Sequence, residues 1–349
     1  MTKNIFHSDF NSHSVRDWEK IAQQELGNKN PWENLTKAKR GTTIKPYYDC
    51  DDEGEEKKIH FPHATSWQNV PKVIVIDEKK ANEEALTHLN EGADGIWFDI
   101  QQHIKVDSLF NKIELPICSV YFNSKDDSFF SALADFVESK SMQEKITGAF
   151  YLNSEKTNSR FGRWKNFHPN GIIVKENENI VDEIVDSLLM AVDRVERLRA
   201  ENFSVEQAFC SISFSISIDT DFFLSIAKIR ALKNLWFALQ EAYQIKNPVP
   251  SFVHAYSKSW IKENFQPHGN MFKQTTAAMA GAMAGCDAIT VEPETSENKT
   301  MTRIARNVSL MLREESHLAK VNDPLAGSFY VDALTHQIAS EAWKKFQQR

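Results

Sequence analysis

The chain of 349 residues has few cysteines and no long apolar run, and these absences exclude several classes of protein. Its four cysteines lie far apart and form no C-x-x-C pair, which favours buried, reduced thiols over a disulfide framework or a zinc site. No apolar stretch approaches the roughly 18 residues of a membrane-spanning helix, and the first residues do not resemble a signal peptide. We therefore expect a cytoplasmic protein with no membrane partner. The cysteines are Cys50, Cys118, Cys210 and Cys286.

A basic block is also missing. Lysine and arginine number 41 against 48 aspartates and glutamates, a net charge of −7, so nucleic acid is not an expected partner. Hydrophobic residues make up 41% and charged residues 26%, which is ordinary for a globular protein. No His-Glu-x-x-His, G-x-S-x-G or Walker-type sequence occurs, so none of the corresponding enzyme sites is predicted.

Residues 1–44 are predicted to form an N-terminal arm with one helix. Ser14 is the expected N-cap, with Asp17 three residues later, and apolar residues that include Trp18 and Ile21 recur on one helical face. A loop from Gly27 to about residue 68 follows. Its acidic run at 49–56 is typical of a solvated surface rather than a metal site, because the carboxylates are consecutive.

The rest of the chain, residues 45–349, alternates short β-branched or apolar runs with helical patterns. Strands that alternate with helices pair in parallel, and eight such units in roughly 250 residues match a (β/α)8 TIM barrel. A doubly wound open sheet is the alternative, although no glycine-rich phosphate loop supports it. The eight predicted strands are 73–76, 95–100, 117–122, 148–152, 171–174, 211–218, 251–256 and 288–291, and the clearest helices are 181–200, 222–242, 271–284 and 331–346.

The sixth predicted strand alternates serine with apolar residues, because Ser211, Ser213, Ser215 and Ser217 are separated by isoleucine and phenylalanine. Neighbouring side chains of a barrel strand face opposite sides. We expect the apolar set to pack against the helices and the serines to line the lumen. The alternative is a surface strand whose serines face water.

Several segments resemble one known family. Residues 303–307 read Arg-Ile-Ala-Arg-Asn and residues 322–330 read Asn-Asp-Pro-Leu-Ala-Gly-Ser-Phe-Tyr. This pattern resembles the end of the barrel domain of methylmalonyl-CoA mutase and related cobalamin-dependent acyl-CoA mutases. Residues 222–236, 253–260 and 44–48 add further matches. The resemblance implies a (β/α)8 barrel whose axis, in the catalytic relatives, is threaded by the pantetheine chain of coenzyme A.

The chain departs from this family where the catalytic members have their acyl site. Those members carry Thr-Arg-Gly-Pro-Tyr-Pro-Thr-Met before the first strand, whereas residues 60–67 here contain no arginine. At the fifth strand they carry Gly-Tyr-His, and here Ile172 replaces the tyrosine and Ile173 the histidine. Tyr256 stands where they have glutamine. An aliphatic side chain cannot hydrogen-bond the thioester carbonyl of a migrating acyl group.

With these departures, the chain resembles the small, non-catalytic subunits of heterodimeric bacterial mutases. The resemblance implies a catalytic large subunit as partner, with adenosylcobalamin bound by that partner and no cobalamin-binding domain in this chain. It assigns no catalytic, cofactor-binding or metal-ligating residue here. It also implies that the arm, with aromatic groups such as Trp18 and Trp32, embraces the partner subunit.

Two alternatives remain open. The first is a catalytic barrel that works with a separate cobalamin subunit, against which Ile173 and the missing arginine both count. The second is an unrelated barrel lyase or aldolase, for which Lys175 is the one candidate nucleophile that follows a predicted strand.

The remaining candidate motifs are short. Residues 166–171, with His168, nearly match the cobalamin-binding pattern Asp-x-His-x-x-Gly, but a turn before the fifth strand is the favoured interpretation. His254 is interpreted as a hydrogen-bonded barrel histidine. Arg303 and Arg306 share a helical face and suit either phosphate or nearby acids. Asp323 is predicted to begin a turn, and the aromatic residues Trp236, Trp260 and Phe265 are interpreted as core or interface groups.

Overall fold

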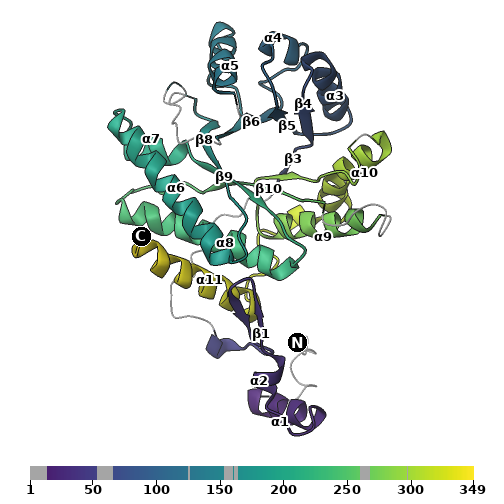
Figure 1. Ribbon diagram of the computed structural model, residues 1–349, viewed down its shortest axis with the longest axis vertical. Helices are drawn as coiled ribbons and strands as arrows, with labels where there is room; N and C mark the ends of the chain where they lie inside the picture. Colours follow the sequence, from purple (N-terminus) through teal and green to yellow (C-terminus); the bar gives the residue numbers. More distant parts are fainter. Residues whose placement is uncertain are drawn as a thin grey trace, which may run out of the picture.

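A closed ring of parallel strands forms the centre of the chain (Figure 1). The structure is a computed structural model that describes residues 14–52, 66–124, 126–152, 160, 164–259, 268–296 and 298–349. Nine strands form one sheet in the order β3-β11-β10-β9-β8-β7-β6-β5-β4, and every pair in it is parallel. Helices surround this ring, as the predicted TIM barrel requires.

The ring closes through a strand that is interrupted once. Strands β3 (Gln68–Asn69) and β4 (Lys72–Val75) are separated by two residues, so they are halves of one strand with Pro71 between them. The backbone N–H of Val70 donates to the carbonyl of Ile289 at 3.0 Å, and that of Trp97 donates to the carbonyl of Pro71 at 2.9 Å. The interrupted strand therefore bonds β11 on one side and β5 on the other. This closure confirms the barrel and rules out an open doubly wound sheet.

The eight strand positions lie close to those predicted. All predicted strand boundaries hold within two residues except the start of the fifth strand and that of the first, whose half β3 was not predicted. The remaining barrel strands are β5 (Gly95–Ile100), β6 (Ser119–Ser124), β7 (Gly148–Leu152), β8 (Phe167–Ile173), β9 (Ser213–Ser217), β10 (Phe252–Tyr256) and β11 (Ala288–Thr290). The helices of the barrel are α3 (Glu78–Asn90), α4 (Val106–Leu109), α5 (Asp127–Ser139), α6 (Ile180–Ala200), α7 (Val205–Cys210), α8 (Phe222–Ala242), α9 (Gly269–Met283), α10 (Lys299–Leu310) and α11 (Phe329–Gln347).

The predicted turn at residues 166–171 is wrong, because this segment belongs to β8. His168 pairs with Ala149 and Gly171 pairs with Tyr151, so β8 has one residue more than β7 between these pairs and forms a bulge. A bulge accommodates the proline at position 169, which has no N–H to give to the sheet. Arg194 of α6 is 2% exposed and donates to the carbonyl of Asn170 at 3.0 Å. The buried guanidinium thus gives a hydrogen bond to a backbone carbonyl within the bulge.

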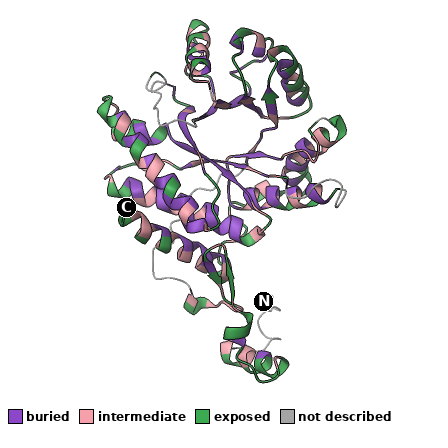
Figure 2. Cartoon of the chain, viewed as in Figure 1, coloured by how far each residue is buried: buried purple, intermediate pink, exposed green. Residues whose placement is uncertain are grey.

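Burial of one face explains where the helices sit. The strands and the inner faces of the helices are buried, whereas the outer helical faces are exposed (Figure 2). In α6 the Asn179 side chain accepts from the backbone N–H of Val181 and caps the helix, whose apolar residues recur every three or four positions. Phe214 of β9 meets Trp236 of α8 with ring centroids 5.2 Å apart, so this strand directs its apolar set outward.

The N-terminal arm has two parts with different positions. Helices α1 (Val15–Glu25) and α2 (Pro31–Leu35) lie away from the barrel, while the hairpin of β1 (Lys37–Lys39) and β2 (Thr42–Ile44) lies against it (Figure 1). Ser14 forms the predicted cap, because its side chain accepts from the N–H of Asp17. The ring of Trp18 lies 5.0 Å from that of Trp32, whereas Ile21 remains 57% exposed. The apolar face predicted for this helix is therefore only partly covered by the chain itself.

Gly148 provides a test of strand packing. Its φ of +127° is unfavourable for any residue with a Cβ, and a Cβ there would overlap the backbone of Val120. We expect Gly148→Ala to lower the free energy of unfolding by at least about 2 kcal/mol, measured by urea denaturation. Gly327→Ala is the control, since Gly327 also has positive φ but no atom within 4 Å of the added carbon, and it should cost only about 1 kcal/mol. Equal effects would contradict the packing explanation.

Candidate functional site

Aromatic rings fill the middle of the barrel lumen. Trp97, Tyr121, Tyr151 and His254 come from four different strands, and each is at most 5% exposed. The His254 ring lies 4.9 Å from the ring of Trp97, 5.6 Å from that of Tyr121 and 5.7 Å from that of Tyr151. Aliphatic layers occupy this position in most TIM barrels. Here the barrel axis is instead occupied by packed aromatic rings.

The serines of β9 face this aromatic cluster. Ser213, Ser215 and Ser217 are at most 1% exposed, and the Oγ of Ser215 lies 2.9 Å from Nδ1 of His254. The prediction of lumen-facing serines is confirmed for these three. Ser211 differs because it precedes the strand and donates its hydroxyl to the carbonyl of Ala208 at 2.7 Å.

Both ring nitrogens of His254 have hydroxyl partners. The Thr290 hydroxyl donates to the carbonyl of Val70, so its oxygen, 2.8 Å from Nε2, accepts from the histidine. Nε2 therefore carries the proton, and Nδ1 accepts from the Ser215 hydroxyl. Burial, with a smaller effect of the Lys72 charge, lowers the pKa of His254 to about 3. The histidine is neutral and both its ring nitrogens are hydrogen-bonded, which confirms the interpretation of a hydrogen-bonded barrel histidine.

Two tyrosines of the lumen differ in the hydrogen bonding of their hydroxyls. Tyr121 donates to Oε1 of Gln68 at 2.5 Å. The hydroxyl of Tyr151, together with Nε1 of Trp97 and Oγ of Ser213, is buried and has no hydrogen-bond partner among the described residues. Burial raises the pKa of both tyrosines well above the ordinary value, so both are neutral phenols.

Charged side chains replace rings at the carboxyl ends of the strands, where TIM-barrel sites lie. Nζ of Lys72 is 3.4 Å from Asp99 and 3.3 Å from Glu292, and it sits 5.1 Å from the ring of Trp97. Burial disfavours the charged lysine, but the two carboxylates outweigh it and raise the pKa of Lys72. This amine is held as an ammonium by its partners and is not an activated nucleophile.

The two isoleucines of β8 lie where the sequence predicted. Ile172 is fully buried in the core between the barrel wall and its helices, and Ile173 packs on the lumen side against the aromatic cluster. Alternation along the strand produces these opposite directions. Lys175, two residues beyond, is exposed.

A buried ion pair lies just beyond β8 and β9. Nζ of Lys228 donates to Glu183 at 2.9 Å and to the carbonyl of Ser217 at 3.0 Å, and both charged side chains are at most 1% exposed. Burial lowers the pKa of Lys228, while Glu183 acts in the opposite direction. Glu176 accepts from the Ser217 hydroxyl at 2.6 Å and pairs with Lys258. These pairs tie the two loops together.

The other candidate residues have structural partners. Nδ1 of His168 lies 2.8 Å from the carbonyl of Cys210, and its ring lies 4.8 Å from that of Phe252. Arg306 is 5% exposed and pairs with Glu91, so the interpretation of pairing with acids is confirmed for it, whereas Arg303 is exposed.

The Asn-Asp-Pro segment joins two helices of the barrel. Asp323 receives two hydrogen bonds from Arg230 of α8, at 3.1 and 3.0 Å, and accepts from the N–H of Leu325 in the predicted turn. Trp236 is core, as predicted. Trp260, Phe265 and residues 60–65 lie outside the described residues.

The described part of the chain has neither a metal-binding cluster nor a membrane-spanning helix. No group of three or more His, Cys, Asp or Glu side chains there could hold a metal ion. None of its helices is long and apolar enough to cross a membrane.

Comparison with known proteins identifies the family. A sequence model of methylmalonyl-CoA mutase matches residues 157–348, which is more than half of the chain. The chain belongs to the methylmalonyl-CoA mutase family. The matched range covers β8 to α11, and it includes the aromatic core residue His254 and both isoleucines of β8.

Several named relatives in this mutase family are small subunits, and others are named methylmalonyl-CoA mutase without a subunit. The chain is 28% identical to the methylmalonyl-CoA mutase small subunit of Porphyromonas gingivalis over 99% of its own length and 64% of that protein. It is 36% identical to the small subunit of Streptomyces virginiae over 48% of this chain and 28% of that one. The chain thus spans less than two thirds of the length of these relatives. A dihydropteroate synthetase structure covers 80% of the chain and 98% of its own at a TM-score of 0.41 and 13% identity, which is too distant to inform function.

A pH series tests the neutral state of His254. Its pKa of about 3 lies below the ordinary value of about 6.5, so the unfolded chain binds more protons between these values. The stability that neutral His254 contributes is complete above about pH 6.5 and falls by about 1.4 kcal/mol per unit as pH decreases. We expect wild type to lose about 2 kcal/mol by pH 5 through this residue, and His254→Gln to lack that loss. The control is His103→Gln at the surface, and parallel curves for wild type and His254→Gln would contradict the burial.

The tyrosine pair tests hydrogen bonding in the lumen. Tyr121→Phe removes a donor and leaves Gln68 without it, so we expect a loss of about 1–3 kcal/mol in the free energy of unfolding. Tyr151→Phe removes a hydroxyl that has no hydrogen-bond partner among the described residues, so it should be neutral or stabilising. Both variants keep the ring, which makes each the control for the other in urea titrations. A larger loss for Tyr151→Phe would contradict the assignment.

Proposed function

We propose that this chain is a non-catalytic subunit of a cobalamin-dependent methylmalonyl-CoA mutase. The observation that carries the proposal is the packed lumen of Trp97, Tyr121, Tyr151 and His254. In the catalytic members of the family the pantetheine chain threads the barrel axis. A ligand site must be concave and open to its ligand, and rings in mutual contact along the axis leave no such route.

The carboxyl end of β8 supports the same proposal. Ile173 points to the lumen at the position where catalytic relatives carry histidine, and its side chain has no donor or acceptor for a thioester carbonyl. The polar groups nearby are already engaged, since Lys72 pairs with Asp99 and Glu292. Among the described residues at this side of the mouth, Lys72, Asp99 and Glu292 are therefore paired with one another rather than free to assist migration of an acyl group.

The cofactor is assigned to the partner. A cobalt-ligating histidine must present a free ring nitrogen while its other nitrogen is oriented by a neighbour. His168 has Nδ1 at the carbonyl of Cys210 and its ring on Phe252, within a barrel strand. His168 thus lies in a barrel strand rather than in a cobalamin-binding domain, so adenosylcobalamin is proposed to bind the larger subunit.

The partner follows from the relatives and from the arm. Relatives named small subunits imply a larger one, which in this proposal isomerises methylmalonyl-CoA and succinyl-CoA. Helices α1 and α2 extend from the barrel and keep Ile21 57% and Leu35 38% exposed. Such apolar groups on a projecting element suit burial against another protein. The arm is thus proposed to hold the catalytic subunit.

Reconstitution tests the proposal. We expect no turnover of methylmalonyl-CoA by the purified chain with added adenosylcobalamin, and a stable complex with the catalytic subunit that buries well above roughly 2,000 Å². A version that lacks residues 1–35 should bind the catalytic subunit at least about tenfold more weakly, because it loses the projecting aromatic anchors. Ile21→Ala on the full chain is the milder companion variant.

Three results would contradict parts of this proposal. Turnover by the chain alone would refute the non-catalytic role. Equal affinity of the full and shortened chains would refute the role of the arm. Failure of both versions to bind any catalytic mutase subunit would refute the subunit assignment itself.

A further inference from the structure

We infer that Arg40 pins the N-terminal arm to the rim of the barrel, so that the direction of α1 and α2 is set in the free chain before a partner binds. The consequence for partner binding rests on the proposed function. The pin itself does not, because it is a property of this chain alone.

The hairpin tip has an arginine at a position that favours other residues. Strands β1 and β2 are joined by Arg40 and Gly41, since Lys39 pairs with Thr42. Both loop residues have positive φ, +48° for Arg40 and +80° for Gly41. Two-residue hairpin loops of this kind strongly prefer Asn or Gly at their first position, because a Cβ is unfavourable there. Local turn preference therefore does not explain the arginine.

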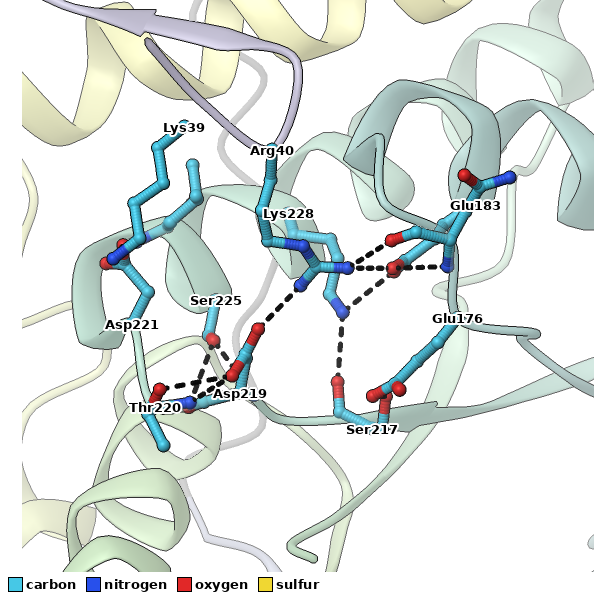
Figure 3. A network of polar contacts seen from close by, with 12 residues as sticks. Lys39, Arg40, Glu176, Glu183, Ser217, Asp219, Thr220, Asp221, Ser225 and Lys228 are labelled. Atoms are coloured by element: carbon cyan, nitrogen blue, oxygen red, sulfur yellow. Dashed lines mark hydrogen bonds and ion pairs between the residues drawn. The ribbon is translucent and has the colours of Figure 1, made fainter. Parts of the chain in front are cut away.

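Contacts with the barrel do explain it (Figure 3). The Arg40 guanidinium donates from NH1 to Asp219 at 2.9 Å and from NH2 to the carbonyl of Asn177 at 2.7 Å, and it also pairs with Glu183. Its side chain is 17% exposed and that of Glu183 is fully buried. Hydrogen bonds between charged groups are about twice as strong as neutral ones, and burial reduces their screening. One side chain thus joins the hairpin to the loops after β8 and β9.

The backbone of the tip is held by a separate set of contacts. The N–H of Ile180, at the start of α6, donates to the carbonyl of Arg40 at 3.1 Å. A Cβ on Gly41 would overlap the side chain of Asn179, so the tip approaches the start of α6 as closely as glycine allows. Lys39 adds an ion pair with Asp221, the N-cap of α8, at 2.6 Å. The tip therefore sits between the first turns of two barrel helices.

The pin also determines the position of the helices beyond the hairpin. Trp18 of α1 contacts Trp32 of α2 at 5.0 Å and Tyr47 at 5.2 Å, so both ends of the hairpin are tied to the helical part of the arm. Tyr48 in turn lies 5.1 Å from Tyr330 of α11. A segment fixed at its tip and at its base cannot swing freely about the barrel. An arm that is already ordered loses less conformational entropy when it binds.

Arg40→Asn is the decisive variant because it separates the turn from the pin. Asparagine suits the left-handed turn position, so the hairpin loop itself is kept or improved. The contacts with Asp219, Asn177 and Glu183 are lost. The matched control is Lys37→Asn in the same hairpin, since Lys37 is exposed and the charge change is the same. Asp219→Asn removes one partner from the barrel side.

Hydrogen exchange of the free chain gives the first readout. We expect Arg40→Asn to raise the exchange rates of the amides of residues 37–44 and of Ile180 roughly tenfold to a hundredfold, and Asp219→Asn to raise them in the same segment. Lys37→Asn should leave them unchanged. Rates in Arg40→Asn equal to wild type would overturn the pin. A rise spread over all barrel strands would also overturn it, since Arg40 would then be a general stabiliser.

Association kinetics with the catalytic subunit give the second readout. A pinned arm binds without first being ordered, so Arg40→Asn should slow association by about tenfold while Lys37→Asn does not. Suppose that hydrogen exchange shows a loosened hairpin in Arg40→Asn but its association rate equals that of wild type. This result would overturn the inference that the arm is preorganised for binding. Absence of any complex, even for wild type, would refute the proposed function and leave the exchange result to decide the pin.

Discussion

The interior of a closed eight-stranded barrel must be filled, and the neutral His254 ring makes that possible here. Its two nitrogens are satisfied by the hydroxyls of Ser215 and Thr290, so a polar ring sits at the barrel axis without an unpaired group. Trp97, Tyr121 and Tyr151 then pack around it. Serines on β9 leave the width that these rings need. The filling of the lumen and the neutral state of the histidine both depend on this one packed cluster.

The barrel itself could be predicted because its signals are local and repeated. Runs of β-branched or apolar residues marked the strands, and helical periodicity marked the helices between them. The alternation in residues 211–218 identified the lumen side of β9. Alternation likewise placed Ile172 and Ile173 on opposite faces of β8. Each of these inferences needs only the neighbours of a residue along the chain.

The features that were missed depend on partners far away in sequence. The strand at residues 167–170 reads as a turn because of His-Pro-Asn-Gly, and it is stabilised by Arg194 from the following helix. The aromatic filling was missed because Trp97, Tyr121 and Tyr151 lie on separate strands, each of which looks ordinary alone. The role of Arg40 was not predicted for the same reason, since its partners lie more than a hundred residues away in the sequence. A left-handed turn position that carries arginine is the one local signal that could have revealed it.

A barrel with a filled axis has a thermodynamic consequence for its evolution. An enzyme of this fold must keep a solvated channel and unpaired polar groups ready for substrate, and such features lower stability in exchange for activity. In this barrel both ring nitrogens of His254 are hydrogen-bonded and Ile173 brings no polar group to the lumen, while Tyr151, Trp97 and Ser213 each keep one buried polar atom without a partner among the described residues. In the proposed non-catalytic role, this barrel is free to be selected for stability, while the catalytic partner keeps the strain that chemistry demands.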